Sequence, residues 1–329
     1  MTDFAESTHN RYWMLGSVEN VNGHRAAALE RSNQVATCDG SSGELTGLWR
    51  QQSADSQVRV LEEEAVVRHF CCQIQLACGC LSNRAPERPP INTRTWRVTS
   101  TACAFLQRFY LNNSVISHDP RIMVMACILL AGKVEESNVS MRELHRLHDK
   151  CKPEEILDAE LSLMRGINYH LKVFHPQSMI VTLVADLKRT FAAGQPNGQP
   201  LAMLSESTRD WHTDAERVVD LLQLTTACLS HPPLDAAVSA LLATQPPALP
   251  FTLESYLSQR FGAAPAKALL GQCSAILALL PAAKACAEGV EAEAAHAALK
   301  RFKLSPLCAW SRHRSATTKK PKVESGTSD

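Results

Sequence analysis

The sequence predicts an all-α protein made of two helical bundles in tandem. Strand-like alternation of apolar and polar residues is rare in its 329 residues, whereas apolar residues recur at three- and four-residue spacing. In addition, Ser117–Ala131 (SHDPRIMVMACILLA) resembles Ser230–Ala243 (SHPPLDAAVSALLA), and a long amphipathic helix is expected before each copy. We therefore expect two five-helix bundles, with helical extensions at the N- and C-terminal ends.

The composition predicts a soluble intracellular protein. Of its residues, 45% are hydrophobic and 20% are charged, and the formal net charge is +1. The start, MTDFAESTHNRYW, lacks the basic and apolar regions of a signal peptide, and no apolar run reaches the roughly eighteen residues of a membrane span. Most of the twelve cysteines lie in apolar helical patterns, which is typical of free thiols. The balanced charge argues against direct binding of nucleic acid.

The first expected unit, residues 1–56, is an N-terminal helical arm followed by a linker. Tyr12 and Trp13 precede a helical stretch at Gly23–Gln34, and the composition of Thr37–Ser56 is that of a flexible connector. Aromatic side chains with a polar tip suit packing against a neighbouring surface, so we expect Tyr12 and Trp13 to contact a partner. We also expect the bundles to fold without this arm.

The first bundle is expected in residues 57–172. Its helices are predicted at Gln57–Cys78, at Trp96–Leu111, from Pro120 to the charged run at Lys133, at Ser140–Leu147 and at Pro153–Gly166. Asp119 before Pro120 is a strong helix start, and Ser140 with Glu143 predicts a capping box. The helix that begins at Pro120 is apolar on every side, so we expect it at the centre of the bundle.

The second bundle is expected in residues 173–289, and residues 290–329 are expected to form a C-terminal helix and a disordered basic tail. One helix of the second bundle is predicted from Asp210 to Leu229, and the next follows Pro233. The tail contains RHRSATTKKPK, a composition typical of nuclear-import signals, which predicts a nuclear location.

Signals of catalysis are scarce. The sequence contains no glycine-rich phosphate loop, no G-x-S-x-G elbow and no H-E-x-x-H motif. The spacing of Cys78 and Cys80 is wrong for a structural zinc site. We therefore expect no catalytic residue, no metal site and no cofactor.

Two charged residues, Lys133 and Glu160, continue apolar stripes of their helices. Lys133 lies one turn after Leu129, and Glu160 lies one turn after Ile156. An isolated buried charge is too costly to keep ionised, so each of them needs a partner. We expect the two to pair, either inside the bundle or at a surface where they offer hydrogen-bonding groups to another protein.

Three segments resemble the cyclin box: Arg108–Val115 (RFYLNNSV), Leu130–Glu136 (LAGKVEE) and Glu160–Leu171 (ELSLMRGINYHL). The resemblance to the cyclin family extends roughly from residue 11 to residue 320 and is strongest over residues 96–172. Within the family, the Leu-Asn-Asn-Ser motif and the arm with Trp13 are most similar to the H-type cyclins. The C-type cyclins are the nearest rival.

The resemblance implies a non-catalytic subunit that binds and activates a cyclin-dependent kinase. In cyclins, the lysine and the glutamate at the places of Lys133 and Glu160 contact the kinase beside its regulatory helix. The other expected kinase-binding residues are Val134, Glu136, Met164, Tyr169 and Leu171. The H-type resemblance further implies the CDK-activating kinase, an assembly-factor subunit and the core of transcription factor IIH.

Three alternatives remain open from the sequence. A C-type cyclin would serve the Mediator kinase instead. A transcription factor of the IIB type also has tandem cyclin-like bundles, but it should carry an N-terminal zinc ribbon, and residues 1–60 contain one cysteine. A helical scaffold is the third alternative, and it would follow if the Lys133–Glu160 pair were internal.

Overall fold

The computed structural model describes residues 4–38, 56–83, 94–147, 151–193, 201–246 and 252–304. The only regular elements in these ranges are helices, which confirms the all-α prediction. They are α1 (Thr8–Trp13), α2 (Val18–Cys38), α4 (Ser56–Asn83), α5 (Arg94–Asn112), α6 (Pro120–Val134), α7 (Met141–Leu147), α8 (Pro153–Gly166), α9 (Pro176–Ala193), α10 (Leu201–Leu222), α11 (Ala227–Ser230), α12 (Pro233–Ala243), α13 (Leu253–Phe261), α14 (Ala263–Leu277), α15 (Leu280–Ala287) and α16 (Ala292–Leu304). Most of the expected linker and the whole basic tail lie outside the described residues.

Helix α6 is the centre of the N-terminal cluster of helices. It is buried from Met123 to Gly132, as its all-round apolar sequence predicts, and α4, α5 and α8 pack around it. At its start, the Asp119 carboxylate accepts a hydrogen bond from the Arg121 amide at 3.0 Å. The predicted capping box of α7 also forms, because the Glu143 amide donates to Ser140 Oγ at 3.2 Å and the Ser140 amide donates to Glu143 Oε2 at 3.1 Å.

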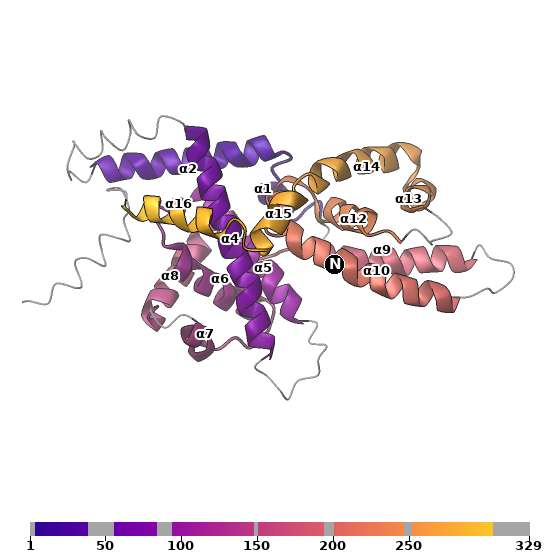
Figure 1. Ribbon diagram of the computed structural model, residues 1–329, viewed down its shortest axis with the longest axis horizontal. Coiled ribbons are helices and arrows are strands. Elements are labelled where there is room, and N and C mark those ends of the chain that lie inside the picture. Colours follow the sequence, from indigo (N-terminus) through magenta and orange to yellow (C-terminus); the bar gives the residue numbers. More distant parts are fainter. Residues whose placement is uncertain are drawn as a thin grey trace, which may run out of the picture.

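The C-terminal half has a core of its own, to which α9, α10, α12, α13 and α14 contribute. Figure 1 shows these helices extending to one side of the N-terminal cluster. The predicted helix Asp210–Leu229 is wrong at both ends, since α10 spans Leu201–Leu222 and α11 is separate. Thr225 marks the break: its hydroxyl donates to the Leu222 carbonyl at 2.8 Å and accepts from the Ala227 amide at 3.2 Å. This local hydrogen bonding competes with helix continuation.

The N-terminal arm and the C-terminal helix both pack on the N-terminal cluster. Trp13, Val21 and Leu29 are buried in the same core as α5 and α6, and Phe302 of α16 joins them. In Figure 1, α2 and α16 lie beside α4. The arm is therefore part of the core, which contradicts the expectation that it is separable from the first bundle.

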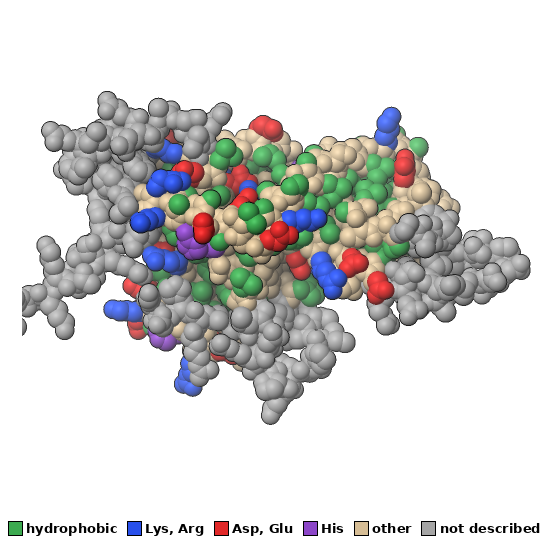
Figure 2. Space-filling model, viewed as in Figure 1, with side chains coloured by type: hydrophobic (Ala, Val, Ile, Leu, Met, Phe, Trp, Pro, Cys, Tyr) green, Lys and Arg blue, Asp and Glu red, His purple; other side chains and the backbone are tan. Residues whose placement is uncertain are grey.

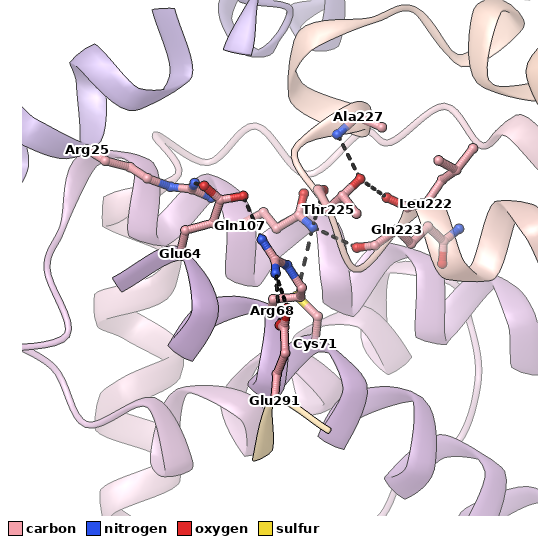
Figure 3. A network of polar contacts seen from close by, with 10 residues as sticks. All are labelled: Arg25, Glu64, Arg68, Cys71, Gln107, Leu222, Gln223, Thr225, Ala227 and Glu291. Atoms are coloured by element: carbon pink, nitrogen blue, oxygen red, sulfur yellow. Dashed lines mark hydrogen bonds and ion pairs between the residues drawn. The ribbon is translucent and has the colours of Figure 1, made fainter. Parts of the chain in front are cut away.

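A polar network joins the two halves of the chain (Figure 3). The Gln107 amide on α5 donates to the carbonyls of Gln223 at 2.6 Å and Thr225 at 2.9 Å, in the turn between α10 and α11. On α4, the Arg68 guanidinium donates to both carboxylate oxygens of Glu291, at 2.9 and 3.2 Å. Because each bond joins segments far apart in the sequence, the network holds the second half of the chain in a defined position on the first.

The expectation about membrane-spanning length needs a correction. The helical stretch Ala263–Ala287, which comprises α14 and α15, is long and apolar enough to cross a membrane, with a mean hydropathy of 1.5 and 22% of the tested window buried. Alanine and leucine dominate this stretch, and Lys267 and Lys284 are its only charged residues. One such helix is weak evidence for a membrane span.

Charged side chains of both signs are interspersed over the face shown in Figure 2. That face has no large area of a single sign, in keeping with the net charge of +1. Such a surface does not present the basic stripe that a phosphate backbone requires.

Candidate partner-binding surface at α6 and α8

Lys133 on α6 and Glu160 on α8 form the predicted pair. The Lys133 ammonium donates to both carboxylate oxygens of Glu160, at 2.6 and 2.8 Å. The Lys133 side chain is 56% exposed, whereas that of Glu160 is 7% exposed. The pair therefore lies at the surface, with its carboxylate between the helices and its ammonium toward solvent. Since an ammonium has three N–H donors, one is left for an acceptor on another protein.

The chain turns back sharply where α6 ends. The Ser137 amide donates to the Gly132 carbonyl at 2.8 Å, and Glu136 adopts a left-handed φ of 51°. A Cβ atom on Gly132 would lie 2.6 Å from Val139 Cγ2, so only glycine permits this close approach. The turn thus places Lys133 and Val134 at a fixed position beside α8.

The two acids that follow Val134 have different surroundings. Glu135 accepts a hydrogen bond from the Thr101 hydroxyl at 2.7 Å, and its Oε1 lies 3.5 Å from His175 Nε2. Burial alone would raise the pKa of Glu135, but hydrogen bonds from His175 and Thr101 outweigh it and keep the pKa below its ordinary value. Glu136 is exposed. Glu135 is therefore an internal anchor of the turn, and Glu136 is the acid on the surface.

A chain of buried hydrogen bonds leads from this turn to the second half of the molecule. Ser100 Oγ lies 2.8 Å from His175 Nδ1 and accepts from the Gln223 amide at 2.8 Å. Burial lowers the pKa of His175, although Glu135 opposes this effect, so the imidazole is neutral at physiological pH. The sequence analysis missed this chain, because its members lie on four separate segments and share no motif.

The chain after α8 also turns through left-handed backbone. Asn168 and Tyr169 have φ values of 53° and 57°, and the Tyr169 amide donates to the Met164 carbonyl at 2.9 Å. Such backbone is rare for a bulky residue and costs about 1–3 kcal/mol, which the surrounding contacts must offset. As a result the Tyr169 side chain is 62% exposed. Met164 and Leu171 are partly buried and pack against the core below it.

The arm contributes one exposed aromatic residue to the neighbourhood of Tyr169. Tyr12 is 51% exposed and stacks on His170, with 4.7 Å between ring centroids. Trp13, by contrast, is 2% exposed, and its ring lies 5.3 Å from the Arg108 guanidinium. The predicted role of Trp13 as a partner contact is therefore unsupported, because its side chain fills this chain's own core.

The structure thus gathers the predicted residues from two segments that pack against each other. We define the docking surface as the set of these residues. Its members are Lys133, Val134, Glu136, Glu160, Met164, Tyr169 and Leu171, with Tyr12 at its edge. Within the described ranges, no group of three or more His, Cys, Asp or Glu residues is placed to hold a metal ion.

Comparison with known families decides what kind of domain carries this surface. The family model of the cyclin N-terminal domain matches residues 95–172, a range that contains α5 to α8 and the whole docking surface except Tyr12. Residues 95–172 are a cyclin N-terminal domain. The resemblance of this chain to the cyclin family is confirmed.

Individual cyclins and a solved structure extend the similarity beyond this domain. Cyclin-H of Xenopus laevis is 33% identical over 204 residues, which is 60% of this chain and 57% of that protein, little more than half of it. Cyclin-C1-1 of Arabidopsis thaliana is 33% identical over 98 residues, which is 27% of this chain and 39% of that protein. A chain in the structure of the CAK complex of Chaetomium thermophilum bound to ATP-γ-S has a TM-score of 0.67 and 18% identity, over 99% of this chain and 98% of that one. The fold of the whole chain is thus that of an H-type cyclin.

Proposed function

We propose that this chain is a cyclin-type regulatory subunit that binds and activates a cyclin-dependent serine/threonine kinase of the CDK-activating class. The observation that carries the proposal is the Lys133–Glu160 pair, which lies at the surface of a cyclin N-terminal domain with its ammonium exposed. A purely internal ion pair would bury both groups, as the helical-scaffold alternative requires.

The docking surface supports a specific mode of binding. The third N–H of Lys133 donates to a backbone carbonyl of the kinase, while Glu160 holds the ammonium in place. Tyr169 and Tyr12 supply exposed aromatic area next to this polar contact. A partner that excluded water from the pair would strengthen it, because charged hydrogen bonds are stronger in a low-dielectric interface.

Activation follows from preferential binding. If the subunit binds the active kinase conformation more tightly than the inactive one, the equilibrium shifts by that differential affinity and by no more. The subunit itself is non-catalytic under this proposal: the kinase supplies the ATP site and magnesium.

The larger assembly is the CDK-activating kinase with an assembly-factor subunit, attached to the core of transcription factor IIH in the nucleus. It would phosphorylate other kinases and the RNA polymerase II tail. The similarity in fold to a CAK chain over 99% of this chain supports this choice. A C-type role in the Mediator kinase has less support, since the C-type match is confined to 27% of the chain. We also propose four functional units at residues 1–56, 57–172, 173–289 and 290–329, with the first and last packed on the second.

A co-expression pull-down tests the proposal. The tagged chain is expressed with a CDK-activating-type kinase or with a Mediator-type kinase, and kinase recovery and phosphorylation of a polymerase-tail peptide are measured. We expect recovery and activity with the first kinase only, and Lys133→Glu to abolish both while Arg142→Ala, an exposed cation on α7, does not. Recovery of the Mediator-type kinase alone would assign the C-type role, and recovery of neither kinase by a folded chain would refute the proposal.

A further inference from the structure

Two cysteines from distant parts of the sequence meet beside the polar network of Figure 3. Cys72 lies on α4 and Cys286 on α15, and their thiols are hydrogen-bonded to each other. Both are free thiols; Cys72 is partly exposed and Cys286 is buried. The ion pair between Arg68, one turn before Cys72, and Glu291 holds the same two parts of the chain together (Figure 3). The two sulfur atoms are therefore kept in contact by a rigid surrounding.

The neighbouring cysteine has a different environment. Cys71 is fully buried on the opposite side of α4, where its carbonyl accepts a contact from the Cys103 thiol at 3.7 Å and its sulfur one from the Gln107 amide at 3.9 Å. Only Cys72 is thus both partly accessible and in contact with a thiol of another segment. Cys71 provides a matched control.

We propose that Cys72 and Cys286 are a peroxide-sensitive modification site that closes to a disulfide between α4 and α15. In the first step the Cys72 thiolate attacks an oxygen of hydrogen peroxide, the O–O bond breaks, and sulfenic acid and water form after protonation of the leaving oxygen. In the second step Cys286 attacks the Cys72 sulfur, its S–H proton leaves with the hydroxyl as water, and the S–S bond forms. Two thiols lose two electrons, and one peroxide is reduced to two waters.

The electrostatics agree with Cys72 as the attacking group. The hydrogen bond from Cys286 lowers the pKa of Cys72 to about 7, against the effect of burial. The same hydrogen bond and burial raise the pKa of Cys286. A thiol with a pKa near ambient pH is the better nucleophile toward peroxide, and its partner remains a protonated resolving thiol.

The disulfide would join the first half of the chain covalently to the segment that follows the second half. Because such a link restricts the unfolded chain, the oxidised protein should melt at a higher temperature than the reduced one. Reduction by a dithiol should reverse the change.

Peptide mapping tests the proposal on the full-length chain. The protein is treated with hydrogen peroxide, remaining thiols are blocked with N-ethylmaleimide, and tryptic peptides are analysed without reduction. We expect residues 69–84, which contain Cys72, to be linked to residues 285–300, whose only cysteine is Cys286. The link should persist in Cys71→Ser, disappear in Cys72→Ser, and be accompanied by a rise of several degrees in melting temperature.

Two outcomes would overturn the proposal. One is quantitative alkylation of Cys286 after peroxide treatment of the folded wild-type chain. The other is a link that survives in Cys72→Ser or joins two molecules on a non-reducing gel. Because the wild-type mapping requires no substitution, a variant that fails to fold does not prevent either result from being seen.

Discussion

The Lys133 ammonium and the Glu160 carboxylate share two short hydrogen bonds but differ eightfold in exposure, at 56% and 7%. Removing the lysine leaves a carboxylate without its cation between α6 and α8. Removing the charge of the glutamate leaves an ammonium that water can solvate. The two sides of the pair should therefore contribute unequally to the stability of the free subunit.

For the isolated subunit, we expect Lys133→Ala to lower the free energy of unfolding by about 1–3 kcal/mol. Glu160→Gln should cost under about 1 kcal/mol, because its amide oxygen still accepts from Lys133 and the lysine stays solvated. Urea denaturation measures both, with exposed Arg142→Ala as the control that changes little. An equal or reversed order would show that the carboxylate is solvated despite its low exposure.

Gly132 and Gly271 provide a second contrast. A Cβ at Gly132 would lie 2.6 Å from Val139 Cγ2, whereas one at Gly271 on α14 has no atom within 4 Å. Gly132→Ala should destabilise the subunit by about 1–3 kcal/mol and weaken kinase binding, because the turn after Lys133 must move. Gly271→Ala should stabilise it by about 0.5–1 kcal/mol through helix propensity. Thermal melting of the two variants checks the signs, and a stable Gly132→Ala would contradict the tight turn.

The adjacent aromatic residues of the arm should separate fold from binding. Trp13→Ala removes a side chain that is 2% exposed and should cost about 3–5 kcal/mol. Tyr12→Ala removes one that is 51% exposed, so it should change stability by under about 1 kcal/mol. Denaturation with parallel kinase pull-down tests this, with Tyr12→Ala expected to reduce only binding. Similar stability of both variants would show that the arm is not part of the core.

Glu63 should make stability depend on pH. Its side chain is fully buried, and burial raises its pKa from 4.5 to about 7 despite hydrogen bonds from Ser114 and Val115. The folded protein thus retains a proton that the unfolded chain releases, and stability falls as pH rises from 4.5 to about 7 and then levels off.

Glu63→Gln should remove this dependence and gain up to about 3 kcal/mol on wild type at pH 8, with no gain at pH 4. Urea unfolding between pH 4 and pH 8 measures the difference, and Glu254→Gln at an exposed position is the control. A gain that is independent of pH would point to packing in place of ionisation.

Periodicity and caps predicted the helices around α6 well, because Asp119 and Ser140 act through neighbours in the sequence. The pairing of Lys133 with Glu160 was predictable for a related reason: each charge interrupts an apolar stripe and needs a partner. Local rules failed at Thr225, where a side chain breaks a helix that propensity would continue. They also failed for Trp13, since burial depends on which distant segment covers a residue.

The roles of the two acids after Val134 were also beyond sequence reasoning. Glu135 is anchored by Thr101 and His175, which come from two other segments. No spacing within LAGKVEE distinguishes it from exposed Glu136. The left-handed backbone at Tyr169 had no signal either, because that conformation usually selects glycine or asparagine.

A double-mutant cycle on kinase affinity tests the central claim most directly. Lys133→Ala, Glu160→Ala and the double variant are each titrated against the purified kinase, and their melting temperatures are measured in its absence. The account predicts that each single variant loses about 2–5 kcal/mol of binding free energy and that the double variant loses far less than the sum. Unchanged affinity in all three variants, with losses confined to melting temperature, would show that the pair is structural and that the kinase binds elsewhere.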